Sequence, residues 1–137
     1  MAEHYTGYFD YHVALLQQFR DRIQTLPPYH IDLAQLTDTD YAVMQTLDNL
    51  CQRQHFDEQM SEQGQWLIER IITGYNHLLQ HLPRDLLWFF GGSCLHYMPD
   101  EEIRFYQQLD ELRYAAEEQQ RPFSIVEAKT FLQSNAP

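Results

Sequence analysis

The sequence predicts an all-α protein, a compact bundle of about five or six helices in a single domain that spans residues 1–137. Three observations lead to this prediction. Apolar residues recur at spacings of three and four in several segments, as on one face of a helix. Residues that favour helices dominate, and β-branched residues are sparse outside Ile71-Ile72 and Ile125-Val126. No alternating apolar and polar run has the character of a strand.

Two helices are predicted in the first part of the chain. The first covers residues 8–26 and ends at Pro27-Pro28, because a pair of prolines cannot continue a helix. After a brief segment at residues 31–36, Thr37 or Asp38 caps a second helix that extends to about residue 54. Their inward stripes consist of Tyr8, His12, Leu15, Leu16, Phe19, Ile23 and Leu26, and of Val43, Met44, Leu47, Leu50 and Cys51.

A long third helix, residues 57–82, has the clearest periodicity in the chain. Pro83 ends it and suits the first turn of a short helix at residues 84–90, which Gly91-Gly92 closes. The inward stripe of the third helix is Leu67, Ile68, Ile71, Tyr75, Leu78, Leu79 and Leu82.

The last part of the chain contains two more predicted helices after an irregular connection at residues 93–98. Pro99 begins the first of them, and its first turn holds the acidic residues 100–102 that a helix N-terminus favours. Arg121-Pro122 ends it. Ser124 and Glu127 have the spacing of a capping box for a final helix that extends to about residue 133.

Composition places the chain among cytoplasmic proteins. Two cysteines, Cys51 and Cys94, provide no disulfide framework. The chain contains no apolar run of the length that spans a membrane, about 18 residues or more. The first five residues, Met1–Tyr5, have neither the basic nor the apolar part of a secretion signal.

The charge restricts the class of partner. Nine basic residues oppose twenty acidic ones, which gives a net charge of −11, and Lys129 is the one lysine. This negative net charge repels nucleic-acid phosphates and anionic membranes, so we expect neither nucleic acid nor membrane as a direct partner. A basic protein would be attracted. The charge could also serve solubility alone.

Gly91, Gly92, Cys94 and His96 form a possible thiol or loop site. Paired glycines allow a ligand or another backbone to come close, and an imidazole near a thiol stabilises the thiolate. The alternative is a helix cap followed by a packed cysteine. Because Cys-x-His neighbours need not meet in space, this spacing is weak evidence for catalysis, and no catalytic residue is predicted.

Histidines provide two further hypotheses. His77 and His81 are four residues apart, a spacing at which two imidazoles can share a metal. Further ligands would have to come from elsewhere, for example Asp85, Cys94 or His96, and we predict neither a metal nor another cofactor. His12 lies within the stripe of the first helix, where a buried core histidine and a proton carrier are the alternatives.

One face of the third helix has the composition of an interface. Large aromatic residues and arginine are common at binding hot spots, and a glycine lets another helix approach. If the helix is central in the bundle, the same face is instead buried in the monomer. The face comprises Trp66, Arg70, Gly74, His77 and His81.

The predicted function is a non-enzymatic protein-interaction or regulatory module that binds a protein partner or a second copy of itself. The first alternative is a small enzyme or metal-dependent protein with its site around Cys94 and His96, and around His77 and His81. The second is a nucleic-acid mimic that presents carboxylates to a DNA-binding protein, although the acidic residues are interspersed with glutamines and aromatics.

Overall fold

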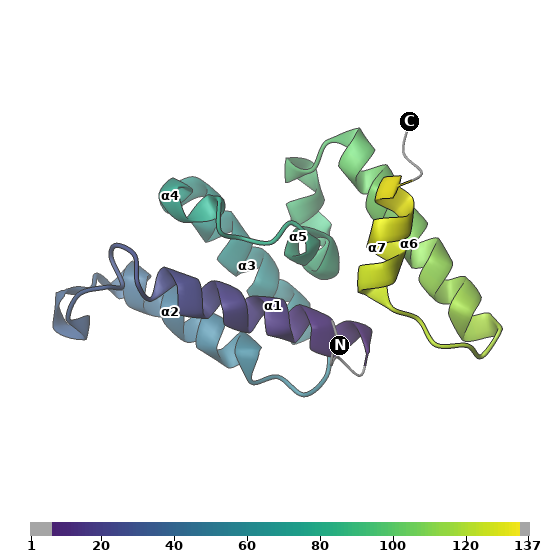
Figure 1. Ribbon diagram of the computed structural model, residues 1–137. Coiled ribbons are helices and arrows are strands. Elements are labelled where there is room, and N and C mark those ends of the chain that lie inside the picture. The colour runs from purple at the N-terminus through teal and green to yellow at the C-terminus, as the bar shows by residue number, and fades with distance from the viewer. Residues whose placement is uncertain (1–6, 135–137) are drawn as a thin grey trace.

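The all-α prediction is confirmed in a computed structural model that describes residues 7–134, except for the side chain of Leu33. Met1–Tyr5, on which the expectation of no secretion signal is based, lie outside these residues. No strand occurs in the described range, and none of its helices has the length and apolar character needed to cross a membrane. The elements (Figure 1) are α1 (Tyr8–Ile23), η1 (Leu33–Gln35), α2 (Asp38–Cys51), α3 (Glu58–Gly74), α4 (Asn76–Leu79), α5 (Asp85–Phe90), η2 (Gly92–Tyr97), α6 (Asp100–Glu118) and α7 (Ile125–Ser134).

The predicted count of five or six helices is too low, mainly because the third predicted helix is divided. It ends at Gly74, and Tyr75 leaves the helical conformation with φ −135° and ψ 52° before α4 begins. The Tyr75 hydroxyl donates a hydrogen bond of 2.6 Å to a carboxylate oxygen of Asp40, at the start of α2. Tyr29 donates to the backbone carbonyl of Asp40 at 2.9 Å. A single continuous helix at residues 57–82 is therefore wrong, and these distant contacts accompany the break.

The helices α1, α2, α3 and α5 supply most of the buried apolar core. Figure 1 shows α1 and α2 running antiparallel, and α3 packs on α2. A capping box begins α2: the Thr37 side chain accepts from the Asp40 backbone, and Asp40 accepts from the Thr37 backbone. The predicted stripes are confirmed as the core-facing sides, and their fully buried members include Leu16, Phe19, Ile23, Val43, Leu47, Leu50, Ile68 and Ile71.

A close approach between α3 and α5 depends on Gly64. A Cβ at this position would lie 2.1 Å from the Phe90 ring, so a side chain here would force the ring to move. Beside it, Ser61 and Gln65 donate hydrogen bonds to the Phe90 carbonyl at 3.1 and 3.0 Å, which satisfies an acceptor at the end of α5. Gly74, where the sequence predicts the approach of a partner helix, is open in the single chain, because a Cβ there would meet nothing within 4 Å.

The last two helices form a hairpin, which lies along one side of the molecule in Figure 1. Ser124 caps α7 by accepting from the Glu127 backbone at 3.1 Å, as the predicted capping box requires. The two helices pack on each other, whereas long side chains join them to the rest of the molecule. These polar contacts supplement apolar packing, since Tyr106, Leu109 and Ala128 of the hairpin belong to the same buried core as α1, α2 and α3. They also form part of the site described below.

We predict that Gly64→Ala destabilises the protein and Gly74→Ala does not. Overpacking a filled core costs about 1–3 kcal/mol, partly offset by the gain of up to about 1 kcal/mol for Ala over Gly in a helix. At Gly74 no overpacking opposes the higher helix propensity of Ala, so this substitution should be neutral or stabilising. Urea titration of both variants measures the difference, and equal stabilities would contradict the packing of Phe90 on Gly64.

Candidate functional site

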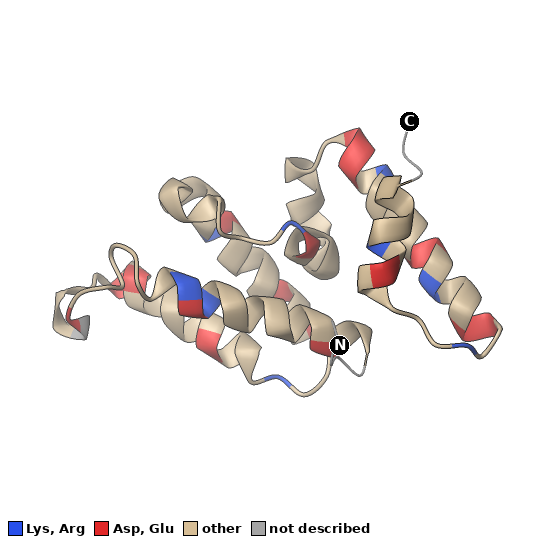
Figure 2. Ribbon diagram, viewed as in Figure 1, with Lys and Arg blue, Asp and Glu red and all other residues tan. Residues whose placement is uncertain are grey.

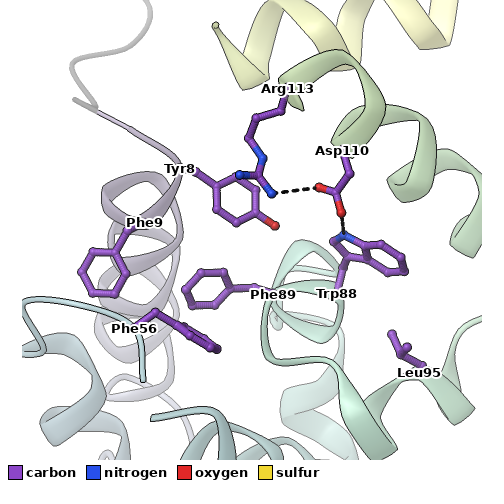
Figure 3. Close-up of a pocket in the computed structure, with 8 residues that line it drawn as sticks. All are labelled: Tyr8, Phe9, Phe56, Trp88, Phe89, Leu95, Asp110 and Arg113. Atoms are coloured by element: carbon purple, nitrogen blue, oxygen red, sulfur yellow. Dashed lines mark hydrogen bonds and ion pairs between the residues drawn. The ribbon is translucent and has the colours of Figure 1, made fainter. Parts of the chain in front are cut away.

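A largely apolar pocket of about 440 Å³ opens between α6 and the part of the chain that precedes it, α1 to η2, which we call the body. Its volume is within the range of small-ligand sites, about 300–1,000 Å³. Four segments contribute to it: the start of α1, the residue before the α3 cap, the α5–η2 region, and α6 (Figure 3). The lining residues are Tyr8, Phe9, Phe56, Trp88, Phe89, Leu95, Asp110 and Arg113.

Three phenylalanines form the apolar end of the pocket. The ring of Phe89 lies 6.3 Å from that of Phe9 and 4.9 Å from that of Phe56, measured between centroids. Phe56 remains 43% exposed, so the apolar wall continues to the surface. The loop that carries it is held by Asp57, which caps α3 by accepting from the Met60 backbone at 2.9 Å.

Arg113 and Asp110 form the polar end, on the opposite side in Figure 3. The Arg113 guanidinium lies 3.8 Å from the centre of the Tyr8 ring and donates to Asp110 at 3.3 Å. The other carboxylate oxygen of Asp110 accepts from the Trp88 indole at 3.1 Å. Burial, reinforced by the charge of Asp110, raises the pKa of Tyr8 to about 12, so its hydroxyl stays protonated at neutral pH. This end therefore presents a balanced pair of charges.

His12 lies beneath the pocket and supports Phe89. The two rings stack at 4.3 Å with an interplanar angle of 5°, and His12 Nδ1 donates to the Tyr8 carbonyl at 2.8 Å. Burial lowers the pKa of His12 to about 4, so the imidazole is neutral near pH 7. The predicted inward position of His12 is confirmed, since the residue is 2% exposed.

A buried carboxylate, Asp85, connects the hairpin to the body next to the pocket. Lys129 on α7 donates to both of its oxygens at 2.9 Å. Tyr11 on α1 and Tyr106 on α6 each donate to it at 3.1 Å. Helices α1, α5, α6 and α7 thus meet at the carboxylate of Asp85, which we call the Asp85 hub.

A second ion pair lies nearby, in which Arg84 donates to Glu102 at 2.7 and 3.0 Å.

The residues of the predicted thiol site lie in different surroundings. Gly91 and Gly92 adopt φ values of 66° and 57°, which close α5 as predicted. Cys94 is fully buried, and burial raises its thiol pKa to about 11. His96 is exposed. This placement favours the alternative of a helix cap with a packed cysteine, because a protonated, enclosed thiol is a poor nucleophile.

The five residues of the predicted interface face are distributed over α3, α4 and the turn that follows α4. Trp66 is 38% exposed on α3, with the Arg70 guanidinium 6.0 Å from the centre of its ring, and Gly74 is exposed at the end of that helix. Beyond the break, the histidines turn towards the end of α1: His77 donates to the Pro27 carbonyl at 2.8 Å, and His81 accepts from Arg22 at 3.4 Å. The five residues therefore do not form one continuous helix face.

The described residues contain no group of three or more His, Cys, Asp or Glu side chains placed to hold a metal ion. The His77–His81 pair accordingly has no further ligands from that range of the chain. Asp85, considered in the sequence analysis as one such ligand, is instead occupied by Lys129 and two tyrosines.

The pocket was not predicted from the sequence. One indication was available: the run Leu86-Leu87-Trp88-Phe89-Phe90 is apolar all around the helix, which means that α5 contacts neighbours on every side. Phe56 and Arg113 carried no such indication, because their role depends on which helices become neighbours.

These features define an all-helical protein with an aromatic-walled pocket and a buried ion pair beside it. The chain belongs to the PA2817-like family, whose model matches residues 4–137. No curated protein and no solved structure matches it.

We predict that acid weakens the protein through His12. Its folded pKa of about 4 lies below the ordinary value of 6.5. The unfolded state therefore binds a proton first, so stability is complete above about pH 6.5 and is lost as the pH falls towards 4. The loss at about pH 5 should be about 2 kcal/mol, since each pKa unit corresponds to about 1.4 kcal/mol.

Urea titrations at about pH 7.5 and pH 5 measure this loss in the wild type and in His12→Phe. The variant retains the other titrating groups and should lose about 2 kcal/mol less stability on acidification. The same decrease in both proteins would show that His12 is not held neutral.

Proposed function

We propose that this protein is a non-enzymatic interaction module that binds a protein partner at the aromatic pocket. The observation that carries the proposal is the pocket itself: an apolar wall that reaches the surface at Phe56, next to polar groups that are already paired with each other. Aromatic residues and arginine in a half-enclosed site are the usual anchors of protein interfaces. We place the protein in the cytoplasm, in keeping with two free, buried cysteines.

The alternatives have less support. An enzyme with its site at Cys94 would need a thiolate, which burial disfavours. A nucleic-acid mimic would need rows of carboxylates, whereas Figure 2 shows acidic residues scattered over the helices with Lys and Arg among them. The Trp66 surface, or self-association through it, is the strongest competitor for the binding role, because Trp66 is a large exposed aromatic beside Arg70.

We expect Phe56→Ala to abolish partner capture from a lysate of cells that produce the protein, with the retained proteins quantified by mass spectrometry. Truncating an anchor aromatic weakens binding by about 2 kcal/mol or more, which is roughly thirtyfold. Because Phe56 is partly exposed, the variant should remain folded.

Two matched variants separate the surfaces. Trp66→Ala tests the α3 face, and Tyr41→Ala removes an aromatic that is 53% exposed on α2 and does not line the aromatic pocket. The proposal requires that both retain the partner. If Trp66→Ala alone loses it, the binding surface is on α3, and if no variant changes specific capture, the pocket has no binding role. Light scattering of the same proteins detects self-association.

A further inference from the structure

We propose that the occupant of the pocket is a peptide segment of the partner that inserts one large apolar side chain, pairs its backbone amide with Asp110 and Arg113, and carries basic residues beside the anchor. This inference rests on the proposed function and specifies its ligand. Three properties of the pocket lead to it, each from different residues.

The apolar end selects a large side chain. Phe9, Phe56 and Phe89 present ring faces and edges to a space that, with its polar end, amounts to about 440 Å³. Rings in offset or edge-to-face arrangements, as between Phe56 and Phe89 at 73°, attract a further aromatic or a long aliphatic group. His12 fixes the Phe89 ring from behind, so the wall exists before the ligand arrives. A preformed wall lowers the cost of binding.

The polar end matches a peptide group. Asp110 can accept from an N–H, because each of its oxygens takes one hydrogen bond from the protein and has room for another. Arg113 has five N–H groups; one donates to Asp110, and the guanidinium also lies 3.6 Å from Glu117. It can therefore donate to a carbonyl. A donor and an acceptor three residues apart on one face of α6 suit the C=O and N–H of a backbone.

This pairing disfavours a lipid or an apolar metabolite. An anionic headgroup would need an uncompensated cation, whereas Arg113 already lies beside Asp110 and Glu117. A purely apolar molecule would cover the polar end and exclude water from the hydrogen-bonding capacity of Asp110 and Arg113 that their mutual bond leaves unused, which is costly. A peptide can place an apolar side chain at the apolar end and pair its backbone amide with the polar groups at the other end.

Charge specifies the residues that flank the anchor. Acidic residues adjoin three of the four segments that line the pocket: Asp10 follows Phe9, Glu58 lies two residues after Phe56, and Glu111 follows Asp110. All three are exposed. With a net charge of −11 behind them, Lys or Arg on either side of the anchor would be attracted, and acidic flanks repelled.

The test is selection of a random peptide library on the purified full-length chain, followed by affinity measurements on an enriched peptide. We expect enrichment of sequences with one Phe, Trp, Leu or Met between basic residues. Replacing the anchor with Ala should weaken binding roughly thirtyfold. Methylating the backbone nitrogen of the anchor residue, which changes the ligand and leaves the protein intact, should weaken it about tenfold or more, because a hydrogen bond to a charged group is lost.

Replacing the basic residues of that peptide with Gln should weaken binding at about 0.01 M salt and have little effect at about 1 M, where the Debye length is about 3 Å. Enrichment without basic residues, an N-methylated peptide that binds as well as its parent, or peptides that bind Phe56→Ala equally well would each overturn the inference. The proposed function fails separately, if Phe56→Ala retains the natural partner. Tight binding of dodecanoate that displaces the peptide, with no loss on N-methylation, would assign the pocket to an acyl chain.

Discussion

The carboxylate of Asp85 is the constraint on which the arrangement of this molecule depends. It is 6% exposed and accepts hydrogen bonds from side chains of α1, α6 and α7, while α5 carries it. A buried carboxylate without partners is strongly unfavourable, and removing one member of a buried ion pair costs about 3–5 kcal/mol. The fold therefore has to bring these four helices together at one point. Burial also raises the pKa of Tyr106, which keeps its hydroxyl a donor to Asp85.

The geometry of the pocket follows from the Asp85 hub through the register of α6. Tyr106, Asp110 and Arg113 are spaced four and three residues apart, so they share one face of the helix. Once Tyr106 bonds to Asp85, the next turns place Asp110 against Trp88 and Arg113 over Tyr8. The polar end of the pocket is thus positioned by the hub. The apolar end is positioned by the body, through His12 under Phe89 and the α3 cap that orients Phe56.

Local features of the sequence predicted the helices well, and long-range contacts explain what they did not predict. Caps at Thr37 and Ser124, the stop at Gly91 and the apolar stripes involve residues close in sequence, and the structure confirms them. The break at Tyr75 accompanies a bond to Asp40, 35 residues earlier, which no periodicity can reveal. Asp85 and Lys129 are 44 residues apart. For the same reason the site could be predicted only in part: His12 was placed inward, but the pocket residues Phe56, Phe89 and Arg113 come from other elements.

Hydrogen exchange in Lys129→Met tests the central claim, that the Asp85 hub holds the hairpin and with it one wall of the pocket. Arg104→Met, an exposed change on α6, is the control. In the variant, amides of α6 and α7 should exchange about a hundredfold faster, equivalent to about 3 kcal/mol of lost local stability, while those of α1–α3 keep their protection. If exchange in α6 and α7 stays at the wild-type rate, the hairpin is held by something other than the hub, and the account is wrong.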